Sequence, residues 1–368
     1  MTETIIRLHE QRPDLQAMPA ALDALPPQLQ DARGRPLRDL RISVTDRCNF
    51  RCVYCMPRTV FDKDYPFLPH DQVLRFEEVA RIAAIFVRLG VRKIRLTGGE
   101  PLLRKNLPHL IELLAQLRCP GGSAPDLTLT TNASLLAKKA PELKAAGLQR
   151  ITVSLDALSD QTFRQMADAD FSVSDVLRGL DAAHAAGLGP IKVNMVVKRG
   201  MNEHEILPMA RYFKGSPFTL RFIEYMDVGA SNGWRMEHVV SLEDILAILA
   251  QDETLALHAL PAQYQGETAQ RFAYRDGGGE VGVIASVTRA FCADCNRIRL
   301  STEGMLYTCL FASGGHDLRR LLRSSTDDDL CARSIAALWR TRADRYSDIR
   351  SADTAGLRRK IEMSYIGG

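Results

Sequence analysis

Three glycines are followed by the same pattern, and this repeat constrains the fold of the chain more than any other feature. Each ends a stretch of helical periodicity and is followed four residues later by an isoleucine that begins a β-branched run: Gly90 and Ile94, Gly147 and Ile151, Gly187 and Ile191. Glycine is the usual residue for the left-handed turn that stops a helix, so each helix leads directly into a strand. The repeat predicts successive βα units with right-handed crossovers and a parallel sheet.

Six β-branched runs are the expected strands of this sheet, and helical stretches such as FEEVARIAAIFVRLG lie between them. Six units are too few for a complete (βα)8 barrel, so the pattern predicts an α/β fold in the form of an incomplete (βα)6 barrel. The runs are LRISVT from Leu40, KIRLTG from Lys93, LTLTTN from Leu127, RITVSLD from Arg150, IKVNMVV from Ile191 and TLRFIEYM from Thr219.

The pattern changes after Ser241, and this change divides the chain. We expect a flexible N-terminal arm over residues 1–35, the partial barrel over residues 36–250 and a C-terminal α+β extension over residues 251–368. The extension contains a Gly-rich hairpin candidate around residues 276–279, a second group of cysteines and an Arg-rich helical tail.

Composition excludes several classes of protein. The 368 residues carry a formal net charge of +4, which is too mild for a general nucleic-acid-binding surface. No apolar run reaches the ~18 residues that a membrane span needs, and we expect no secretory signal because the N-terminal segment lacks a continuous apolar region. Eight cysteines in such a chain indicate a reducing, cytoplasmic compartment and metal binding instead of disulfides.

Three of the cysteines lie within the string RISVTDRCNFRCVYC: Cys48, Cys52 and Cys55, spaced C-x3-C-x2-C. Three thiolates this close can hold three irons of a 4Fe–4S cluster. No fourth cysteine follows nearby, so one iron stays open to a small molecule, and Tyr54 puts an aromatic ring beside it. The alternative is a structural zinc site or buried thiols, but such frameworks usually use paired C-x2-C units.

This triad resembles the signature of the radical S-adenosylmethionine (SAM) superfamily, C-x3-C-x-aromatic-C. The resemblance implies that the open iron chelates the methionine moiety of SAM and that one electron from the cluster releases a 5′-deoxyadenosyl radical. It also implies the same partial barrel. Members of the superfamily also have a GGEP-like motif that contacts the methionine amino group of SAM. This chain resembles them there too, because Gly98-Gly99-Glu100-Pro101 ends its second predicted strand.

Polar residues also follow the third, fourth and sixth predicted strands. In βα folds the carboxyl ends of the strands hold the active site, although each of these segments taken alone could be a plain loop. Together they predict a ring of polar groups around one mouth, made of Thr130, Thr131 and Asn132, then Ser154, Leu155 and Asp156, then Glu224, Tyr225 and Met226.

A second triad, Cys292, Cys295 and Cys309, has the spacing C-x2-C-x13-C. Taken alone this spacing favours zinc, with His316 as a fourth ligand. Behind a radical SAM domain it favours an auxiliary 4Fe–4S cluster, again with one iron free for a ligand.

Cations recur on segments that should line the barrel. Arg297 and Arg299 stand two residues apart, so on an extended segment their planar forks point the same way and match phosphate oxygens. A single charged residue on a strand is usually solvated, but buried cations need anionic partners, and a triphosphate would supply them. The strand cations are Arg41, Lys93, Arg95, Lys192 and Arg221.

The order of these motifs resembles one family within the superfamily, molybdenum cofactor biosynthesis protein A, whose members are GTP 3′,8-cyclases. The resemblance covers about residues 36–368 and rests on DRCNFRCVYCMP, IRLTGGEPLLR, LTTN, RITVSLDAL, RFIEYMDVG, FCADCNRIRLSTEGMLYTCLF and the terminal SYIGG. It implies a radical SAM lyase that converts GTP to (8S)-3′,8-cyclo-7,8-dihydroguanosine 5′-triphosphate, the first step of molybdenum cofactor (molybdopterin) biosynthesis. The SAM-derived radical would abstract the hydrogen at C3′, and the C3′ radical would then attack C8 of the guanine. An electron, with the auxiliary cluster as a candidate source, and a proton would then complete the dihydro product.

The resemblance also implies the role of each matching position. Cys48, Cys52 and Cys55 hold the SAM cluster, and Tyr54, Gly99, Ser154 and Met226 contact SAM. Arg41, Arg95, Thr130, Lys192, Arg297 and Arg299 contact GTP, while Cys292, Cys295 and Cys309 hold the auxiliary cluster whose free iron binds guanine. Gly367 and Gly368 reach the cavity and serve catalysis together with Arg297 and Arg299. One position departs from the family: Ala133 follows TTN, where glycine is common.

Two other functions compete with this one. A radical SAM peptide maturase with an auxiliary cluster would be expected to have more cysteines and a peptide-recognition domain. A non-enzymatic iron–sulfur module, or one stabilised by zinc, has no need for GGEP or for cations on successive strands. As partners we expect GTP, an electron donor such as a flavodoxin-type reductant, and the next pathway enzyme, cyclic pyranopterin monophosphate synthase. We expect no nucleic acid and no membrane, and a monomer or homodimer.

Overall fold

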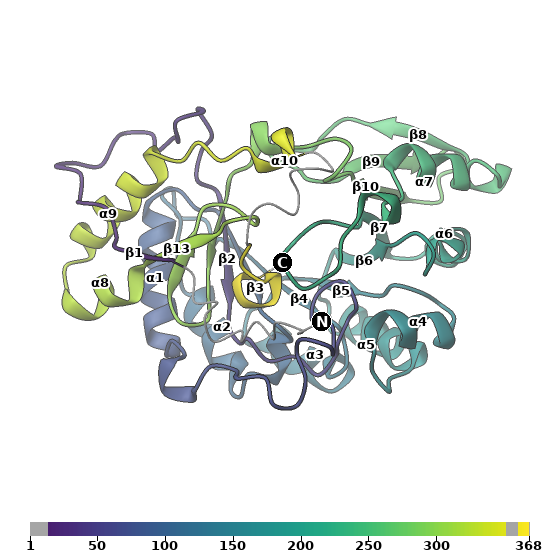
Figure 1. The fold of residues 1–368 in the computed structure, drawn as a ribbon, viewed down its shortest axis with the longest axis horizontal. Coiled ribbons are helices and arrows are strands. Elements are labelled where there is room, and N and C mark those ends of the chain that lie inside the picture. The colour runs from purple at the N-terminus through teal and green to yellow at the C-terminus, as the bar shows by residue number, and fades with distance from the viewer. Residues whose placement is uncertain (1–13, 351–359, 368) are drawn as a thin grey trace, which may run out of the picture.

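The computed structural model describes residues 14–350 and 360–367. Its centre is a set of six parallel strands, each paired with the next in sequence order. In Figure 1 they form an arc, and helices lie along its outer side. Each strand lies where the sequence predicts one, and the pairing confirms the predicted α/β architecture. The strands are β2 (Asp39–Ser43), β3 (Lys93–Thr97), β4 (Asp126–Thr131), β5 (Arg150–Ser154), β6 (Ile191–Val197) and β7 (Phe218–Glu224).

The connecting helices end as the glycine repeat predicts. Gly90, Gly147 and Gly187 have φ values of +104°, +104° and +77°, in the region that favours glycine. Each follows the end of a helix, and the next strand begins within four residues. The helices are α1 (Phe76–Arg88), α2 (Leu107–Ala115), α3 (Leu136–Ala145), α4 (Asp160–Ala167), α5 (Val173–Ala185), α6 (Ile206–Phe213) and α7 (Leu242–Leu249).

Alternation along the strands separates the core from the interior of the arc. In β2, Leu40 and Ile42 are fully buried in the hydrophobic core, whereas Arg41 between them lines a cavity. In β3, Leu96 is likewise buried in the hydrophobic core, whereas Arg95 lines the cavity. Because successive side chains of a strand point to opposite faces, the apolar face packs against the helices and the polar face turns inward.

The C-terminal strands extend the same sheet at both of its edges. β11 (Arg297–Leu300) pairs in parallel with β2, and β10 (Glu280–Ile284) pairs in parallel with β7. β9 (Gln270–Tyr274) and β10 form the hairpin predicted around residues 276–279. The outer strands are β8 (Leu257–Leu260), β12 (Met305–Tyr307), β13 (Gly314–Asp317) and β1 (Asp14–Gln16), which gives the order β1-β13-β12-β11-β2-β3-β4-β5-β6-β7-β10-β9-β8.

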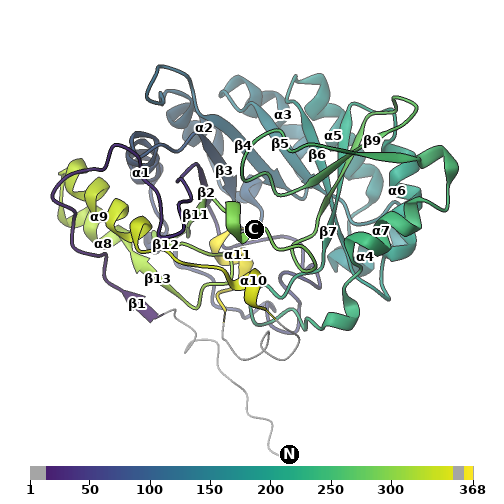
Figure 2. The ribbon, with the colours of Figure 1, turned by 90° about the horizontal axis from the view of Figure 1, so that it is seen from above.

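The remaining α-helices belong to the C-terminal extension. Figure 2 shows α8 (Leu318–Ser324) and α9 (Asp328–Arg340) at one side, and α10 (Tyr346–Ile349) and α11 (Met363–Ile366) near the centre of the molecule. No helix of the described residues is long and apolar enough to cross a membrane. Short 3-10 helices cover His70–Gln72, Pro101–Leu103, Glu203–Glu205, Met236–His238, Glu253–Leu255 and Cys292–Asp294.

Residues 14–35 differ from the flexible arm expected over residues 1–35. β1 pairs in parallel with β13, and Asp31 and Arg35 are 7% and 2% exposed. They form an ion pair of 2.6 Å with each other, and their contacts with Arg342 at 2.9 Å and with the Cys292 carbonyl at 2.7 Å fix the segment against the rest of the molecule. Residues 1–13 of the expected arm lie outside the described residues.

Candidate active site

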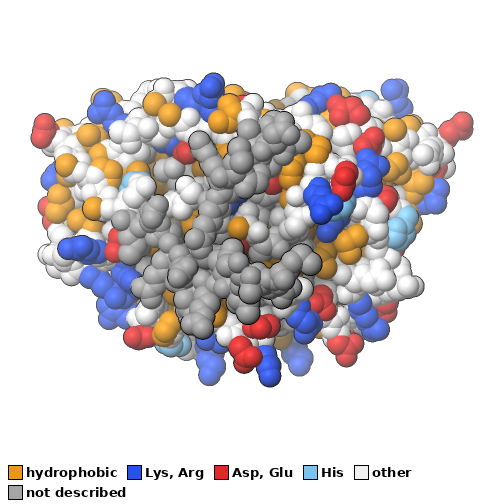
Figure 3. Space-filling model, in the orientation of Figure 1, with side chains coloured by type: hydrophobic (Ala, Val, Ile, Leu, Met, Phe, Trp, Pro, Cys, Tyr) orange, Lys and Arg blue, Asp and Glu red, His pale blue; other side chains and the backbone are white. Residues whose placement is uncertain are grey.

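A cavity of about 670 Å³ lies inside the arc of strands and brings the predicted site residues together. Basic and acidic side chains are interspersed around the outer face in Figure 3, in agreement with the mild net charge. Inside, the lining has ten arginine and lysine residues but only five aspartate and glutamate residues, and we call the part that carries the cations the cationic wall. The predicted residues that line it are Arg41, Cys48, Cys52, Tyr54, Cys55, Lys93, Arg95, Gly99, Thr130, Ser154, Lys192, Arg221, Met226, Cys292, Cys295, Arg297, Arg299 and Cys309.

The first cysteine triad lies in the loop that follows β2. The Cys52 carbonyl accepts from the backbone N–H of Cys55 at 3.0 Å and from that of Met56 at 2.9 Å, which forms a tight turn. The three thiols are free, and burial raises the pKa of Cys48 to about 11 and raises those of Cys52 and Cys55 as well. Buried thiols like these become thiolates only when a metal compensates the negative charge, so the triad fits metal ligation.

Tyr54 is held over this triad by Asp156. Its hydroxyl donates to Asp156 Oδ2 at 2.8 Å, and the other carboxylate oxygen accepts from the Val196 N–H at 2.9 Å. Burial raises the pKa of Asp156 to about 6. Asp156, just after β5, therefore fixes the aromatic ring next to Cys52 and Cys55.

The GGEP segment joins the cysteine loop to β4. An added Cβ at Gly99 would collide with the Arg47 carbonyl, so this glycine is required by the cysteine loop itself. The next residue, Glu100, is 1% exposed and accepts from Thr131 Oγ1 and from the Asn132 N–H, both at 2.7 Å. Burial raises the pKa of Glu100 to about 7. The motif is therefore a structural clamp as well as a candidate ligand contact.

Strand register stacks the cations on one wall. Arg41 lies opposite Arg95 on one side and Arg299 on the other. Arg95 Nη1 donates to Thr130 Oγ1 at 2.8 Å, but the Nε atoms of Arg41 and Arg95 are buried with no hydrogen-bond partner among the described residues. Buried donors without partners carry a desolvation cost, so this wall fits an anion that would accept from them.

The lowered pKa values of these cations also indicate an anion site. Burial, with repulsion from neighbouring arginines, lowers the pKa of Arg41 well below its usual range. Burial and mutual repulsion favour the deprotonated forms of these side chains, and a bound polyanion would favour their protonated forms instead. Burial likewise lowers the pKa values of four more cations: Lys93 to about 7, Lys192 to about 8, Arg221 to about 9 and Arg299 to about 10. Arg297 differs, because burial is outweighed by Cys295 beside it, which raises the pKa of Arg297.

The second triad has one activated thiol. Burial opposes ionisation of Cys295, but the charges of Arg297 and Arg342 lower its pKa to about 6. Burial raises the pKa of Cys292, and that of Cys309 to about 12. The zinc alternative loses its fourth ligand, because His316 lies on β13 with Nδ1 3.3 Å from the Ala17 carbonyl, away from the lining.

Neither triad forms a ready-made single-ion site. Within the described ranges, no group of three or more His, Cys, Asp or Glu side chains is arranged to hold one metal ion. A 4Fe–4S cluster places each cysteine on a different iron, so its ligands do not have to converge on one point. Each triad supplies three free cysteines that line one cavity, which is the ligand set that a 4Fe–4S cluster with one open iron requires.

The C-terminal tail reaches this cavity. Met363 lines it, and the Gly367 carbonyl accepts from Arg299 Nη1. Gly367 has a φ of +76°, and an added Cβ there would collide with Thr97 Cγ2. Gly368, the second glycine predicted to act here, lies outside the described residues.

Comparisons with known proteins agree with this geometry. The model described as Radical SAM superfamily matches residues 42–213, and that described as Molybdenum Cofactor Synthesis C matches residues 218–348. The GTP 3′,8-cyclase of Acidothermus cellulolyticus is 51% identical and covers 92% of this chain and 99% of its own. The GTP 3′,8-cyclase of Xanthomonas campestris pv. campestris is 49% identical, and the match covers 97% of this chain and 99% of that protein. This chain belongs to the GTP 3′,8-cyclase family.

The GTP 3′,8-cyclase family is thus the one that the motifs resemble, and that prediction is confirmed. Among solved structures, the crystal structure of Streptococcus suis SuiB bound to S-adenosylmethionine matches 59% of this chain and 47% of that one. Its sequence identity is 18% and its TM-score 0.47.

Several buried residues of this GTP 3′,8-cyclase family member were missed by sequence reasoning. Asp227 is 3% exposed and accepts from Arg350 and Lys360, both at 2.6 Å, so it ties the C-terminal segment to the end of β7. It follows EYM directly, so the strand-end rule could have found it. Asp31 had no such signal, because its partner Arg342 lies 311 residues away. Ala133, the departure from the family pattern, has a φ of +64°, which explains why glycine is common there.

Proposed function

We propose that this chain is a GTP 3′,8-cyclase that converts GTP to (8S)-3′,8-cyclo-7,8-dihydroguanosine 5′-triphosphate in molybdenum cofactor biosynthesis. The observation that carries the proposal is the single cavity in which two cysteine triads and a wall of buried, under-partnered cations meet. Family membership names the reaction, and the cavity supplies the groups that this reaction needs. We regard the six central strands as an incomplete (βα)6 barrel.

The first triad is the proposed site of a 4Fe–4S cluster and SAM. Cys48, Cys52 and Cys55 would bind three irons, and the cluster with SAM supplies a 5′-deoxyadenosyl radical. The protein's own contribution is positioning. The GGEP clamp holds the cysteine loop against β4, and Asp156 holds the ring of Tyr54. Gly99, Ser154 and Met226 also line the cavity, and we assign them as contacts of SAM.

The cationic wall is the proposed GTP site. Arg41, Arg95 and Lys192 line the cavity from β2, β3 and β6, and Thr130 fixes Arg95 by accepting from it. A triphosphate would accept from the free Nε atoms of Arg41 and Arg95 and would neutralise like charges that now repel. Burial of the wall also keeps water from a reactive carbon centre, which prevents side reactions.

The second triad is the proposed site of an auxiliary 4Fe–4S cluster that binds the guanine end of GTP. Cys295, whose pKa is lowered to about 6, is the thiol most ready to ligate. Arg297 and Arg299 on the adjoining β11 would face the phosphates or ribose, and the contact of Arg299 with Gly367 links them to the tail. As partners we further propose a flavodoxin-type electron donor and the next pathway enzyme, in the cytoplasm.

The test uses full-length protein reconstituted without oxygen and given SAM, GTP and dithionite. We expect 5′-deoxyadenosine and cyclised nucleotide in equal amounts, with about eight irons per chain from two 4Fe–4S clusters. Cys52→Ser should abolish both products, because a weaker oxygen ligand replaces one of only three thiolates. SAM cleavage that leaves GTP unchanged, or four irons per chain, would contradict the proposal.

A further inference from the structure

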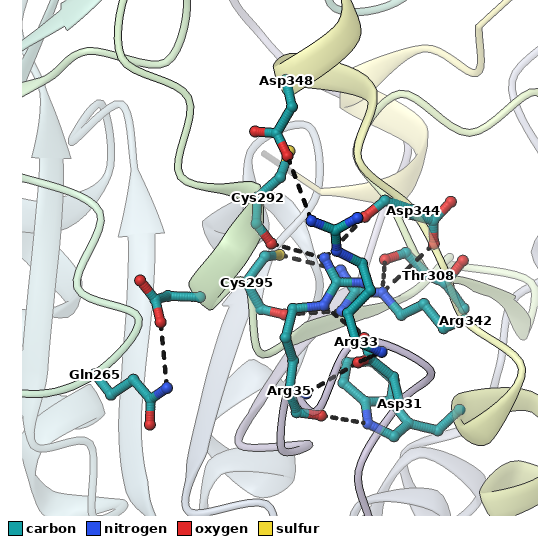
Figure 4. A network of polar contacts seen from close by, with 12 residues as sticks. Asp31, Arg33, Arg35, Gln265, Cys292, Cys295, Thr308, Arg342, Asp344 and Asp348 are labelled. Carbon is teal, nitrogen blue, oxygen red and sulfur yellow. Dashed lines mark hydrogen bonds and ion pairs between the residues drawn. The ribbon is translucent and has the colours of Figure 1, made fainter.

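Asp31 is the centre of a buried network that joins residues 31–35 to Arg342, near the end of the C-terminal extension. Its Oδ2 accepts from Arg35 Nε at 2.6 Å and from Arg342 Nη1 at 2.9 Å. Its Oδ1 accepts from the backbone N–H groups of Arg33 and Arg35, both at 2.9 Å. All four acceptor bonds come from two segments that lie far apart in sequence and side by side in Figure 4.

The two arginines of this network reach the second cysteine triad. Arg342 donates to the Cys295 carbonyl at 2.8 Å, to Cys295 Sγ at 3.2 Å and to the Thr308 carbonyl at 3.0 Å, next to Cys309. Arg35 Nη1 donates to the Cys292 carbonyl at 2.7 Å. The network therefore holds Cys292 and Cys295 directly, as Figure 4 shows, and holds Cys309 through the preceding residue, Thr308.

The network lies behind the cavity, not in it. The side chains of Asp31 and Arg342 are 0% and 1% exposed, and neither residue is among the described residues that line the cavity. These residues therefore do not touch substrate. A buried ion pair between well-fixed groups costs free energy to desolvate, so the contacts of its arginines with one sulfur and four backbone carbonyls, including that of Asp344, are its most evident use.

We propose that Asp31, Arg35 and Arg342 position the C-terminal cysteine triad, and that Arg342 raises the reduction potential of its iron–sulfur cluster by donating a hydrogen bond to Cys295 Sγ. The inference rests on the proposed function, which gives that triad a cluster. A donor to a ligand sulfur stabilises the added negative charge of the reduced cluster, and hydrogen bonds to sulfur are an established control on cluster potential. Outer-shell partners also fix the orientation of the ligands.

The experiment is a redox titration of the reconstituted full-length chain, followed by electron paramagnetic resonance of both clusters. In Arg342→Gln we expect a lower potential for the C-terminal cluster, an unchanged potential for the N-terminal one, and roughly 10–100-fold weaker retention of the C-terminal cluster. The matched control is Arg81→Gln. Arg81 also donates to one carboxylate and two carbonyls, those of Asp328, Leu322 and Ser325, and none of these belongs to either cysteine triad.

Asp31→Asn keeps Arg342 but loosens it, so the C-terminal cluster should be retained more weakly than in the wild type, though less weakly than in Arg342→Gln, while the N-terminal cluster is retained fully. Its readout is cluster retention and not potential, because loss of the Asp31 charge by itself raises the potential, and it carries the test of positioning if Arg342→Gln does not fold. Selective loss of the C-terminal cluster also supports the inference. An unchanged C-terminal potential at full iron content, or equal changes in both clusters, overturns it. Wild-type protein with four irons instead of about eight would instead refute the auxiliary cluster, and hence the proposed function, before any variant is compared.

Discussion

Lys93 shows how one residue reports on the whole cationic wall. Burial lowers its pKa to about 7, although Asp39 lies 3.9 Å away and acts in the opposite direction. Because the folded pKa lies below the ordinary value of 10.5, the unfolded chain binds more protons between these two pH values. Lys93 therefore contributes stability that grows as the pH rises from about 7 toward 10.5, as long as no anion occupies the cavity.

We predict that GTP binding takes up protons at pH 8, because a triphosphate beside Lys93 raises the pKa of its ammonium group above the solution pH. Calorimetry in two buffers of different ionisation enthalpy measures this uptake under anaerobic conditions. Lys93→Gln should remove most of it, while Lys138→Gln, a change outside the cavity lining, should leave it unchanged. Binding without proton exchange in the wild-type chain would refute a phosphate beside Lys93.

At the scale of elements, the site depends on close approaches between loops and strand ends. The cysteine loop passes so near the end of β3 that Gly98 and Gly99 have no room for a side chain. The tail meets the same strand, where Gly367 lies against Thr97. Both contacts join segments that carry proposed ligands to the rigid sheet.

Gly99→Ala should cost the N-terminal cluster and keep the C-terminal one, because the new Cβ collides with the Arg47 carbonyl and displaces the cysteine loop. We expect iron content to fall by about half, with SAM cleavage lost, as measured by iron analysis and 5′-deoxyadenosine formation. Gly121→Ala is the control, since its Cβ would meet nothing within 4 Å although its φ of +100° is strained for alanine. Two intact clusters in Gly99→Ala would show that the loop tolerates the shift.

Gly367→Ala should reduce cyclisation at least tenfold, the effect of about 1.4 kcal/mol, while both clusters and GTP binding persist. The new methyl group collides with Thr97 Cγ2, which Thr97→Ser removes. The double variant should recover part of the activity, and the strain of a φ of +76° should prevent full recovery. The readout is cyclised nucleotide per 5′-deoxyadenosine. Wild-type turnover in Gly367→Ala would make the tail dispensable.

At the scale of the whole molecule, the cavity collects cations from both the central strands and the C-terminal extension. Arg41 and Arg95 come from β2 and β3, whereas Arg299 comes from β11, which is added to the sheet from the far end of the sequence. Repulsion among them opposes folding until an anion binds. The fold and its ligand are therefore coupled through charge.

We predict that inorganic triphosphate, with no nucleoside, stabilises the chain against thermal unfolding. At a concentration of about 100 times its Kd the gain is about 2.7 kcal/mol. Orthophosphate at equal ionic strength should give much less, because it spans fewer of the cations. The comparison should be repeated in Arg95→Gln, where the gain from triphosphate should shrink. Equal effects of the two anions would point to general screening instead of a site.

Much of this architecture could be predicted because its signals are local. Each β-branched run and each glycine that ends a helix lies within one short window, so β2 to β7 were found within a residue or two. The pairing of β11 with β2 and the burial of Asp31 were not found, because they depend on contacts between distant segments that no periodicity records. The close approach at Gly99 was predicted as one to a ligand, whereas the structure shows it to be an approach to the backbone of the cysteine loop; the ligand contact stays a prediction.

The span of 311 residues between Asp31 and Arg342 has a consequence for biosynthesis. A ribosome releases the chain from its N-terminus, so the first triad and its strands can assemble while later segments are still being made. The second triad cannot, because one half of its support emerges near the start of translation and the other half near the end. Metallation would then follow a fixed order, and a chain that terminates early would carry its first cofactor without ever completing the second.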